Sequence, residues 1–538
     1  REVVDRVAAE VPDTLLLAEA FWLMEGYFVR TLGMHRVYNS AFMHMLRDEK
    51  NAEYQQVIRE TVSFDARILG RYVNFMNNPD ERSAIDQFGS DDKYFGVATL
   101  LATLPGLPMF GHGQFEGYSE QYGMEFRRAQ RDEQPNVWLV DRHRRQISPL
   151  LHQRWRFSGA AGFRQLTALE GGGETHDVFV YANDAEHAPR GAVERRSLVV
   201  YLNRYPRAHV RIPGVAEALG LGHDPAGYLI LHDHRSGQDY LRQVSDLREH
   251  GLELSLDGYG CHVFLDFEEV SDRADAGWAE LAQRLGLSGI PDAHVALRRM
   301  RDEPLREAVG VVFATRIAQE AFLPELAAEP DTQAGADAAR AGLVAAFDRL
   351  AAAVGVDDDI VSVAYETGRL AARVRAVRPR LVAQALAGWA LFSAIGDLAC
   401  ADERERTVIA YDEWDGAAAV GDLARRAGTG DAQAWRASEL SRALLFLAPG
   451  ALAEAADADG LPLAWFDSAA VRDATGWNEW DGQAYLSAEA WDVFVDALAE
   501  REMLLDLADA AGAASELRRR AAEAGYQVTA PDESPRRR

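Results

Sequence analysis

Two carboxylates in the first eighty residues stand directly after apolar runs, which is the position where α/β barrels keep their catalytic groups. Glu19 closes the apolar run 15–18, and Asp80 follows the run 71–76 and the polar turn 77–79. A buried carboxylate without a partner costs several kcal/mol, so a strand-end acid is expected to face a polar pocket. For Glu19 taken alone, a solvated surface position is an equal alternative. The shared placement of the two acids favours the pocket.

Two carboxylates from different strands of one barrel face suit the cleavage of glycosidic bonds. One acid must protonate the leaving oxygen, while others stay ionised beside an oxocarbenium-like sugar. Phe21 and Trp22 follow Glu19 and offer apolar faces to a sugar ring, although core packing is the usual role of such a pair. The other polar groups that come just after predicted strands are expected to bind the substrate: Asn77, Asn78, His112 and Gln114.

The elements that must position these groups alternate between strand and helix. Extended runs are predicted at 13–22, 33–39, 71–76 and 105–114, and helical periodicity at 40–47, 51–70, 93–104 and 141–157. Strands and helices that alternate with short connections are typical of parallel βαβ units. The first 170 residues are therefore predicted to form a parallel α/β domain.

Three motifs resemble the α-amylase family of glycoside hydrolases and transglycosidases, family 13. They are Leu-Leu-Ala-Glu-Ala-Phe-Trp (16–22), Phe-Met-Asn-Asn-Pro-Asp-Glu (75–81) and Leu-Pro-Gly-Leu-Pro-Met-Phe-Gly-His-Gly-Gln (104–114). In order and kind they are similar to the family's fifth, seventh and eighth barrel strands. The resemblance implies a partial (β/α)8 TIM-type barrel with strands 5–8. It also implies that Glu19 is the general acid/base and that Asp80 hydrogen-bonds the reacting sugar and stabilises the transition state.

The motifs depart from the family at several positions. Pro79 stands where the family has a His that hydrogen-bonds the sugar, and Gly111 and His112 stand where Tyr is frequent. The family's Glu after Gly-Gln is Phe115 here, with Glu116 one residue later. The family's nucleophile belongs to an Arg-x-Asp pattern on the fourth strand, and no Asp in this sequence matches it.

The first residue is Arg1, so the chain is expected to start within a domain, as the C-terminal half of a barrel. Half a barrel leaves two strand edges unpaired, which is an aggregation liability. Expressed alone, such a chain is expected to be poorly soluble and inactive on starch-like glucans, and the N-terminal half should rescue it.

The whole chain is predicted to be multidomain, of α/β, β and α parts in that order. Residues 1–170 are assigned to the half barrel, 171–270 to an antiparallel β-sandwich, 271–530 to one or two helical domains and 531–538 to a disordered tail. Short β-rich runs between Gly, Pro and Asp turns indicate the sandwich. Period-3.6 patterns rich in Ala, Leu, Arg and Glu indicate the helices. The glycines at 171–173 are predicted to be a linker.

Composition excludes some classes of partner. The 538 residues carry 57 Lys and Arg against 84 Asp and Glu, a net charge of −27, which disfavours nucleic acid and anionic membranes. The apolar stretch 381–396 is too short to span a bilayer and is predicted to be a buried helix. Cys261 and Cys400 have no metal-binding spacing, and His232-Asp233-His234 fits a solvated strand end better than a metal pair. No metal or cofactor is predicted, and the scarce cysteines favour the cytoplasm.

The sequence is compatible with three functions. The leading one is a retaining hydrolase or transglycosidase acting on an α-glucan or oligosaccharide, of which this chain is a part. The second is an amylase-like glucan-binding or assembly module without activity, which Pro79 favours. The third places the function in the helical half, as a partner-docking domain.

Overall fold

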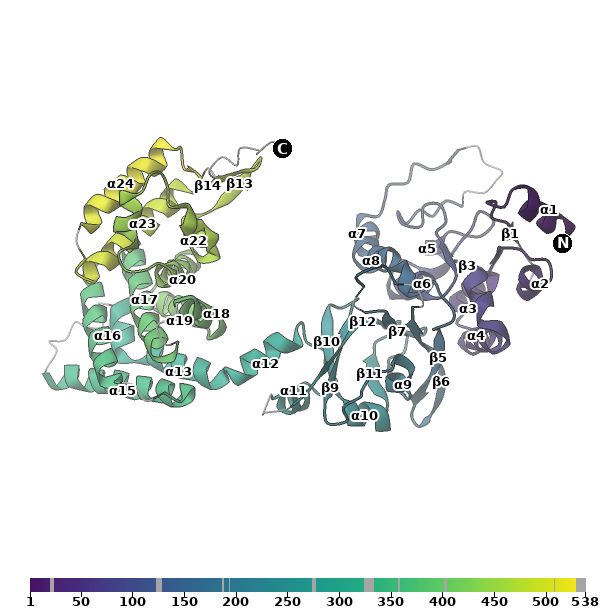
Figure 1. Cartoon of the computed structure of the whole chain (residues 1–538), viewed down its shortest axis with the longest axis horizontal. Helices are drawn as coiled ribbons and strands as arrows, with labels where there is room; N and C mark the ends of the chain where they lie inside the picture. The colour runs from purple at the N-terminus through teal and green to yellow at the C-terminus, as the bar shows by residue number, and fades with distance from the viewer. Residues whose placement is uncertain are drawn as a thin grey trace. The chain divides into compact units, whose positions relative to one another are not determined.

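The computed structural model describes residues 1–19, 24–121, 128–185, 188–192, 194–272, 277–323, 333–356, 359–400, 404–507 and 509–528. The chain divides into two compact units, Arg1–Leu297 and Arg298–Arg538. Figure 1 colours the chain from purple at the N-terminus to yellow at the C-terminus. The N-terminal unit holds a small parallel sheet and a large antiparallel sheet, and the C-terminal unit is mostly helical.

The parallel sheet has the order β1-β2-β3-β4, and every neighbouring pair runs parallel. Its strands lie inside the four runs predicted from the sequence: β1 (Leu17–Ala18), β2 (Arg36–Tyr38), β3 (Tyr72–Phe75) and β4 (Leu107–Met109). Within the described part of the chain, no strand pairs with the outer edge of β1 or of β4. The four-stranded sheet therefore has no strand partner at either edge within the residues that the structure describes.

Helices precede, connect and follow the strands of this sheet. In order they are α1 (Glu2–Glu10), α2 (Glu25–Arg30), α3 (Ser40–Arg47), α4 (Asn51–Asp65), the 3-10 helix η1 (Ala66–Arg71), α5 (Ala84–Phe88), α6 (Asp92–Thr103), α7 (Val137–Gln146), α8 (Ser148–His152) and η2 (Arg154–Arg156). The spacing of buried residues explains how α4 packs. Asn51, Tyr54, Gln55 and Ile58 recur at three- and four-residue intervals, so one face of the helix is buried.

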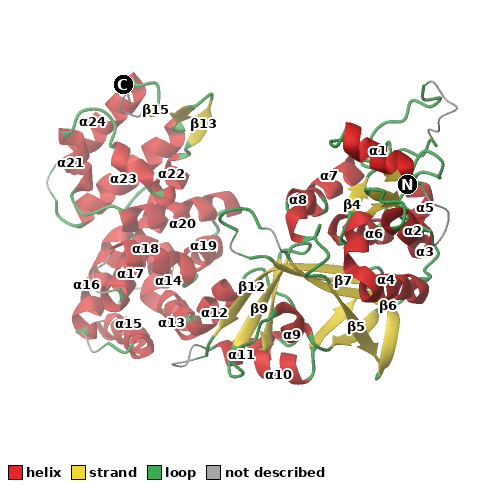
Figure 2. Ribbon diagram, turned by 45° about the vertical axis from the view of Figure 1, so that its right-hand side comes forward, coloured by secondary structure: helices red, strands yellow, loops and turns green. Residues whose placement is uncertain are grey.

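The antiparallel sheet has eight strands in the order β10-β9-β12-β7-β6-β5-β8-β11. They are β5 (Arg164–Glu170), β6 (Gly173–Asp184), β7 (Arg196–Leu202), β8 (Ala208–Ile212), β9 (Tyr228–Asp233), β10 (Gln238–Gln243), β11 (Leu252–Leu256) and β12 (Cys261–Val270). Short helices accompany them: α9 (Val215–Leu219), α10 (Val244–Glu249), α11 (Trp278–Leu285) and α12 (Ala293–Arg301). Figure 2 shows the strands in yellow.

The strands pair antiparallel, as predicted for the β-sandwich. The two separate packed sheets of a sandwich, however, do not form. All eight strands are joined by hydrogen bonds in one continuous sheet. Alternating apolar residues report which strand faces are buried, and a strongly curved sheet and a sandwich bury the same faces. The predicted linker at 171–173 is also wrong. Gly171 and Gly172, with φ of 58° and 89°, make the turn between β5 and β6, which is a position that favours glycine.

Buried amide side chains join the helix α4 to the antiparallel sheet. Asn51 Nδ2 donates to Asp177 Oδ1 at 2.9 Å and to the Asn203 carbonyl at 3.0 Å. Gln55 Nε2 donates to the carbonyls of His176 at 2.8 Å and Val178 at 3.0 Å. Figure 2 shows α4 beside β6. These bonds satisfy polar groups that the packed apolar surface would otherwise leave without water.

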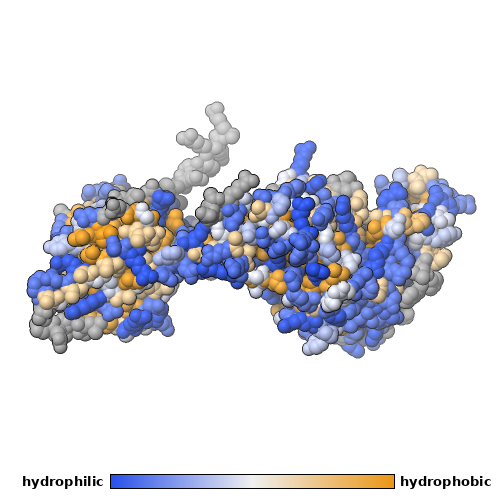
Figure 3. All heavy atoms as spheres, turned by 90° about the horizontal axis from the view of Figure 1, so that it is seen from below, coloured by the Kyte–Doolittle hydropathy of each residue, from blue (hydrophilic) through white to orange (hydrophobic). Residues whose placement is uncertain are grey.

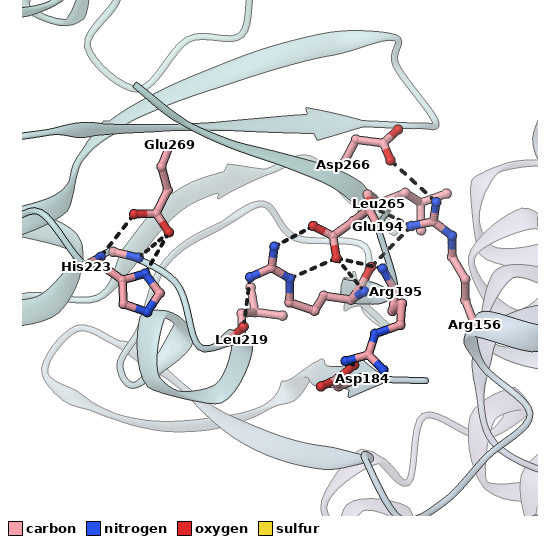
Figure 4. Close-up of polar contacts among 11 residues, drawn as sticks. Arg156, Asp184, Glu194, Arg195, Leu219, His223, Leu265, Asp266 and Glu269 are labelled. Carbon is pink, nitrogen blue, oxygen red and sulfur yellow. Dashed lines mark hydrogen bonds and ion pairs between the residues drawn. The ribbon is translucent and has the colours of Figure 1, made fainter. Parts of the chain in front are cut away.

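A second link runs through Arg156 in η2. Its Nη1 donates to the Leu265 carbonyl at 2.7 Å, and its Nη2 lies 3.5 Å from Asp266 Oδ1, as Figure 4 shows. Apolar residues of both parts, among them Phe75 and Tyr201, belong to one core cluster. The parallel strands and the antiparallel sheet therefore share a core.

The C-terminal unit is built from α13 (Glu303–Ala314), α14 (Arg316–Phe322), α15 (Gln333–Val354), α16 (Ile360–Val374), α17 (Arg380–Ala399), α18 (Arg404–Glu413), α19 (Gly416–Arg426), α20 (Asp431–Phe446), α21 (Ala451–Asp457), η4 (Leu463–Asp467), α22 (Ala469–Thr475), α23 (Ala488–Leu504) and α24 (Ala510–Glu523). A small antiparallel sheet of β13 (Asn478–Trp480), β14 (Gln483–Tyr485) and β15 (Gln527–Val528) closes it. On the face drawn in Figure 3, hydrophobic residues in orange gather on this unit beside hydrophilic ones in blue.

Among the described helices, α17 alone is long and apolar enough to cross a membrane, and 83% of its most apolar window is buried in the structure. It is thus the buried helix that the sequence predicted. Arg501 of α23, fully buried, donates to the carbonyls of Leu444 at 2.6 Å and Leu447 at 2.7 Å and caps the end of α20.

Candidate functional site at the end of the parallel strands

Glu19 and Asp80 both follow strands of the parallel sheet at the same edge. Glu19 comes directly after β1, and Asp80 lies in the loop after β3. Both side chains are exposed. Because parallel strands end on one side of the sheet, and β2 separates β1 from β3, the ends of these two strands lie about 10 Å apart.

Tyr38, the last residue of β2, stands between the two acids in strand order. Burial raises the pKa of Tyr38 above its usual value of 10.0, and the charges of Glu19 and Asp80 raise it further. The two carboxylates thus act on one phenol.

A buried amide network behind the edge sets the register of the strands. Asn39, directly after β2, donates from Nδ2 to Asn74 Oδ1 at 2.8 Å, and Asn74 Nδ2 donates to the Pro105 carbonyl at 3.3 Å. Asn39 and Asn74 are 3% and 2% exposed, so these bonds have no competing water. The network links the ends of β2 and β3 to the segment that enters β4.

The turn that carries Asp80 is held by its own side chains. Asn78 Oδ1 accepts from the backbone N–H of Asp80 at 3.1 Å, and the Asn78 carbonyl accepts from Glu81 N–H at 3.2 Å. This is the Asx turn expected before a helix start. The predicted substrate ligand Asn78 therefore already uses one of its oxygens to hold the loop.

Asn77 lies beneath the Gly-rich loop that follows β4. It is 6% exposed, and among the described residues no donor reaches its buried Oδ1. A Cβ placed on Gly111 would lie 2.4 Å from both terminal atoms of the Asn77 amide, so this close approach requires glycine. This oxygen is therefore buried beneath the loop and is not exposed on the surface of the site.

The predicted ligand Gln114 is buried within the loop instead of lining its surface. Its Oε1 accepts from Gly111 N–H at 3.1 Å, and its carbonyl accepts from the Tyr94 hydroxyl at 2.8 Å. The same hydroxyl lies 2.9 Å from His143 Nε2. Burial lowers the pKa of His143 to about 4, so its imidazole is neutral at physiological pH. These side chains support the loop from behind.

His112 projects differently from Gln114. It is exposed, and its ring lies 6.2 Å from that of Tyr118. Phe21 and Trp22, the predicted sugar-stacking pair, lie outside the described residues. The structure therefore places Glu19 after β1 and Asn77, Asn78 and Asp80 after β3, with the loop of His112 after β4.

No group of three or more His, Cys, Asp or Glu side chains in the described chain has the arrangement of a metal site. In the His-Asp-His segment, His232 Nδ1 pairs with Asp239 Oδ1 at 2.8 Å. Asp233 Oδ2 contacts His262 Nδ1 at 2.9 Å and accepts from Ser236 Oγ at 2.7 Å. These side chains therefore bind one another within the antiparallel sheet. Both cysteines are free thiols.

Sequence reasoning overlooked Tyr38 and the contact between Asn77 and Gly111. A signal for Tyr38 existed, since it is a polar aromatic at the end of a predicted strand between the two acid-bearing strands. The Asn77–Gly111 contact joins residues 34 positions apart and carried no local signal.

No family model and no curated protein matches the sequence. Solved structures similar to the chain include an α-amylase from Anoxybacillus, with 14% identity over 50% of this chain and 55% of that one, at a TM-score of 0.36. The native debranching enzyme of Nostoc punctiforme has 16% identity over 49% and 54%, at a TM-score of 0.37. The α-amylase of Geobacillus thermoleovorans in complex with acarbose has 18% over 50% and 56%, at 0.36.

The chain thus spans about half the length of these solved structures. They are enzymes of the kind that the three strand motifs resemble. The chain resembles the α-amylase family in its three strand motifs, and the similarity to these solved structures covers about half of its length.

Proposed function

We propose that this chain supplies the acid/base half of a retaining glycoside hydrolase or transglycosidase that acts on α-glucans. Glu19 protonates the glycosidic oxygen and then activates the water or the acceptor hydroxyl. Asp80 accepts hydrogen bonds from the sugar hydroxyls while positive charge develops on the ring. The observation that carries the proposal is that Glu19 and Asp80 end strands on both sides of β2 and act electrostatically on the same Tyr38 hydroxyl.

The environment of the two acids supports these roles. Both are exposed at the strand ends, so a substrate can reach them. Asn78 Oδ1 accepts a hydrogen bond from the backbone N–H of Asp80. This bond holds the turn and leaves the Asp80 carboxylate free of Asn78.

The covalent nucleophile has to come from elsewhere. The resemblance places it on the strand next to β1, and no described strand occupies that edge. A segment that pairs with the free edge of β1 would bring a carboxylate beside Glu19. In the proposed reaction this group attacks the anomeric carbon and Glu19 completes the exchange.

The test replaces Glu19 by Gln in the protein that carries this chain and measures turnover and binding of maltooligosaccharides. Removing a general acid lowers the rate by about 10²–10⁴-fold, while binding should persist because the amide keeps the shape of the acid. Glu53→Gln, an exposed residue of α4, is the matched control and should leave the rate unchanged. Turnover unaffected by Glu19→Gln would remove Glu19 from the acid role.

A glucan-binding module without activity is the second candidate. Pro79, exposed in the turn before Asp80, has no N–H and no polar side chain to offer a sugar hydroxyl. In this case maltooligosaccharides bind, no turnover is detected before or after the Glu19 replacement, and Asp80→Asn weakens binding.

A further inference from the structure

Tyr38 ends β2, the strand that lies between β1, which precedes Glu19, and β3, which precedes Asp80. The register pairs Tyr38 with Val73, so its ring lies on the same face of the sheet as Val73 and Phe75. The Tyr38 and Phe75 rings meet edge to face, with centroids 5.4 Å apart. Phe75 is buried and Tyr38 is partly exposed, so the ring is anchored while the hydroxyl end remains accessible.

The hydroxyl of Tyr38 is free to bind a ligand. Among the described residues, no hydrogen bond to this hydroxyl is present, whereas the nearby Asn78 and Gln114 side chains are engaged in their loops. The two carboxylates that act on it are Glu19 and Asp80. The next acid along, Glu81, is turned to His44, with 3.6 Å between Oε1 and Nε2.

Tyr38 differs chemically from its two neighbours. Ionised carboxylates only accept hydrogen bonds, whereas a protonated phenol also donates one. Because its pKa is raised, Tyr38 stays protonated across the neutral range. A sugar hydroxyl between two carboxylates gives its single proton to one of them and needs a donor for its oxygen.

We propose that Tyr38 is a third substrate-contacting residue of this site, whose hydroxyl donates a hydrogen bond to a hydroxyl oxygen of the sugar unit held between Glu19 and Asp80. This inference rests on the proposed function, because it assumes that a glucan unit occupies the strand-end site. It extends that function by assigning a donor to the middle strand, β2.

The experiment uses Tyr38→Phe, which removes the hydroxyl and keeps the ring on Phe75. Maltotriose is the probe, and its affinity is measured by calorimetry in the Glu19→Gln background, where turnover cannot consume it. We expect the dissociation constant to rise about tenfold, as for the loss of one ligand hydrogen bond, with an unchanged thermal midpoint.

A second measurement needs no ligand. The difference between the alkaline absorbance titrations of each protein and its Tyr38→Phe partner isolates the Tyr38 phenol. Glu19→Gln and Asp80→Asn should each move its midpoint to lower pH, because each removes a negative charge that opposes ionisation. Glu53→Gln should not move it.

The outcomes separate the two ideas. If Glu19→Gln abolishes turnover but Tyr38→Phe binds maltotriose as tightly as its parent, the donor role is wrong and the proposed function stands. If the parent neither binds nor cleaves maltooligosaccharides, the proposed function is wrong and the donor role fails with it. A Tyr38 titration that neither acid replacement shifts would also overturn the inference.

Discussion

Contacts of Asn77 and Asn78 determine the shape of the strand-end site. The Asn77 amide lies directly over the Cα of Gly111, and its Oδ1 has no donor within the described chain. The Oδ1 atom of the adjacent Asn78 accepts a hydrogen bond from the backbone N–H of Asp80 and so holds its turn. Two consecutive asparagines thus have different tasks: Asn77 packs beneath the loop of Gly111, and Asn78 holds the turn of Asp80.

Replacing Gly111 by Ala tests this contact. The new methyl group would lie 2.4 Å from the Asn77 amide, so the loop or the amide must move. Overpacking of this kind costs about 1–3 kcal/mol, and maltotriose binding should weaken as Asn77 shifts. Thermal unfolding and calorimetric titration measure the two effects.

Gly70→Ala is the matched control, because no atom lies within 4 Å of the Cβ it would add. It should preserve both the thermal midpoint and maltotriose affinity. A Gly111→Ala protein that behaves like this control would show that the contact is not constraining.

Elements in the N-terminal unit are coupled by buried polar groups. The helices α6 and α7 meet through the Tyr94 hydroxyl and His143 Nε2, 2.9 Å apart, and the ring of Phe115 from the loop after β4 lies 4.3 Å from the His143 ring. His143 is 0% exposed. The loop that carries His112 therefore rests on a histidine that must stay neutral.

This histidine predicts an acid sensitivity. Its pKa falls from 6.5 to about 4 on folding, so the unfolded chain takes up a proton that the folded one does not. The stabilisation is complete above pH 6.5 and is lost as the pH falls toward 4, by roughly 3 kcal/mol in total. His143→Gln, which stays neutral, should flatten this part of the pH dependence.

Unfolding of the N-terminal unit between pH 4 and 7, followed in both proteins, measures the difference in slope. Equal losses of stability in the two proteins would mean that other groups account for the acid sensitivity.

At the scale of the whole chain, each unit has its own core. The largest apolar cluster lies wholly within residues 308–528, and the two others lie within 18–265. Buried polar residues are also specific to each unit. Asn51 serves the N-terminal core, while Arg501, paired with Glu502 at 2.7 Å, serves the C-terminal one. Separate cores give separate cooperative units.

We therefore expect two transitions in calorimetry of the whole chain. Asn51→Ala leaves the partners of its amide unsatisfied and should destabilise only the N-terminal unit, by about 2–3 kcal/mol. Arg501→Met leaves Glu502 buried without its partner and should destabilise only the C-terminal unit, by about 3 kcal/mol or more. One transition that both substitutions shift together would contradict this division.

Local pattern was sufficient for the order and type of the elements. The four short strands of the parallel sheet lie within predicted runs, because short apolar runs bounded by polar, Gly or Pro residues are local signals. The α-amylase resemblance was equally local, since it rests on three short motifs. The acids Glu19 and Asp80 were found because Glu19 directly follows one apolar run and Asp80 follows another after the short polar turn 77–79.

Only the tertiary structure decided what lies beside these residues. One continuous eight-stranded sheet in place of a sandwich, the burial of Gln114 and the contact of Asn77 with Gly111 all depend on segments distant in sequence. Alternation along a strand reports that a face is buried, but not which partner covers it. The placement of Tyr38 between two acids is of the same kind, because strand order arises from pairing across the chain and leaves no mark on any one segment.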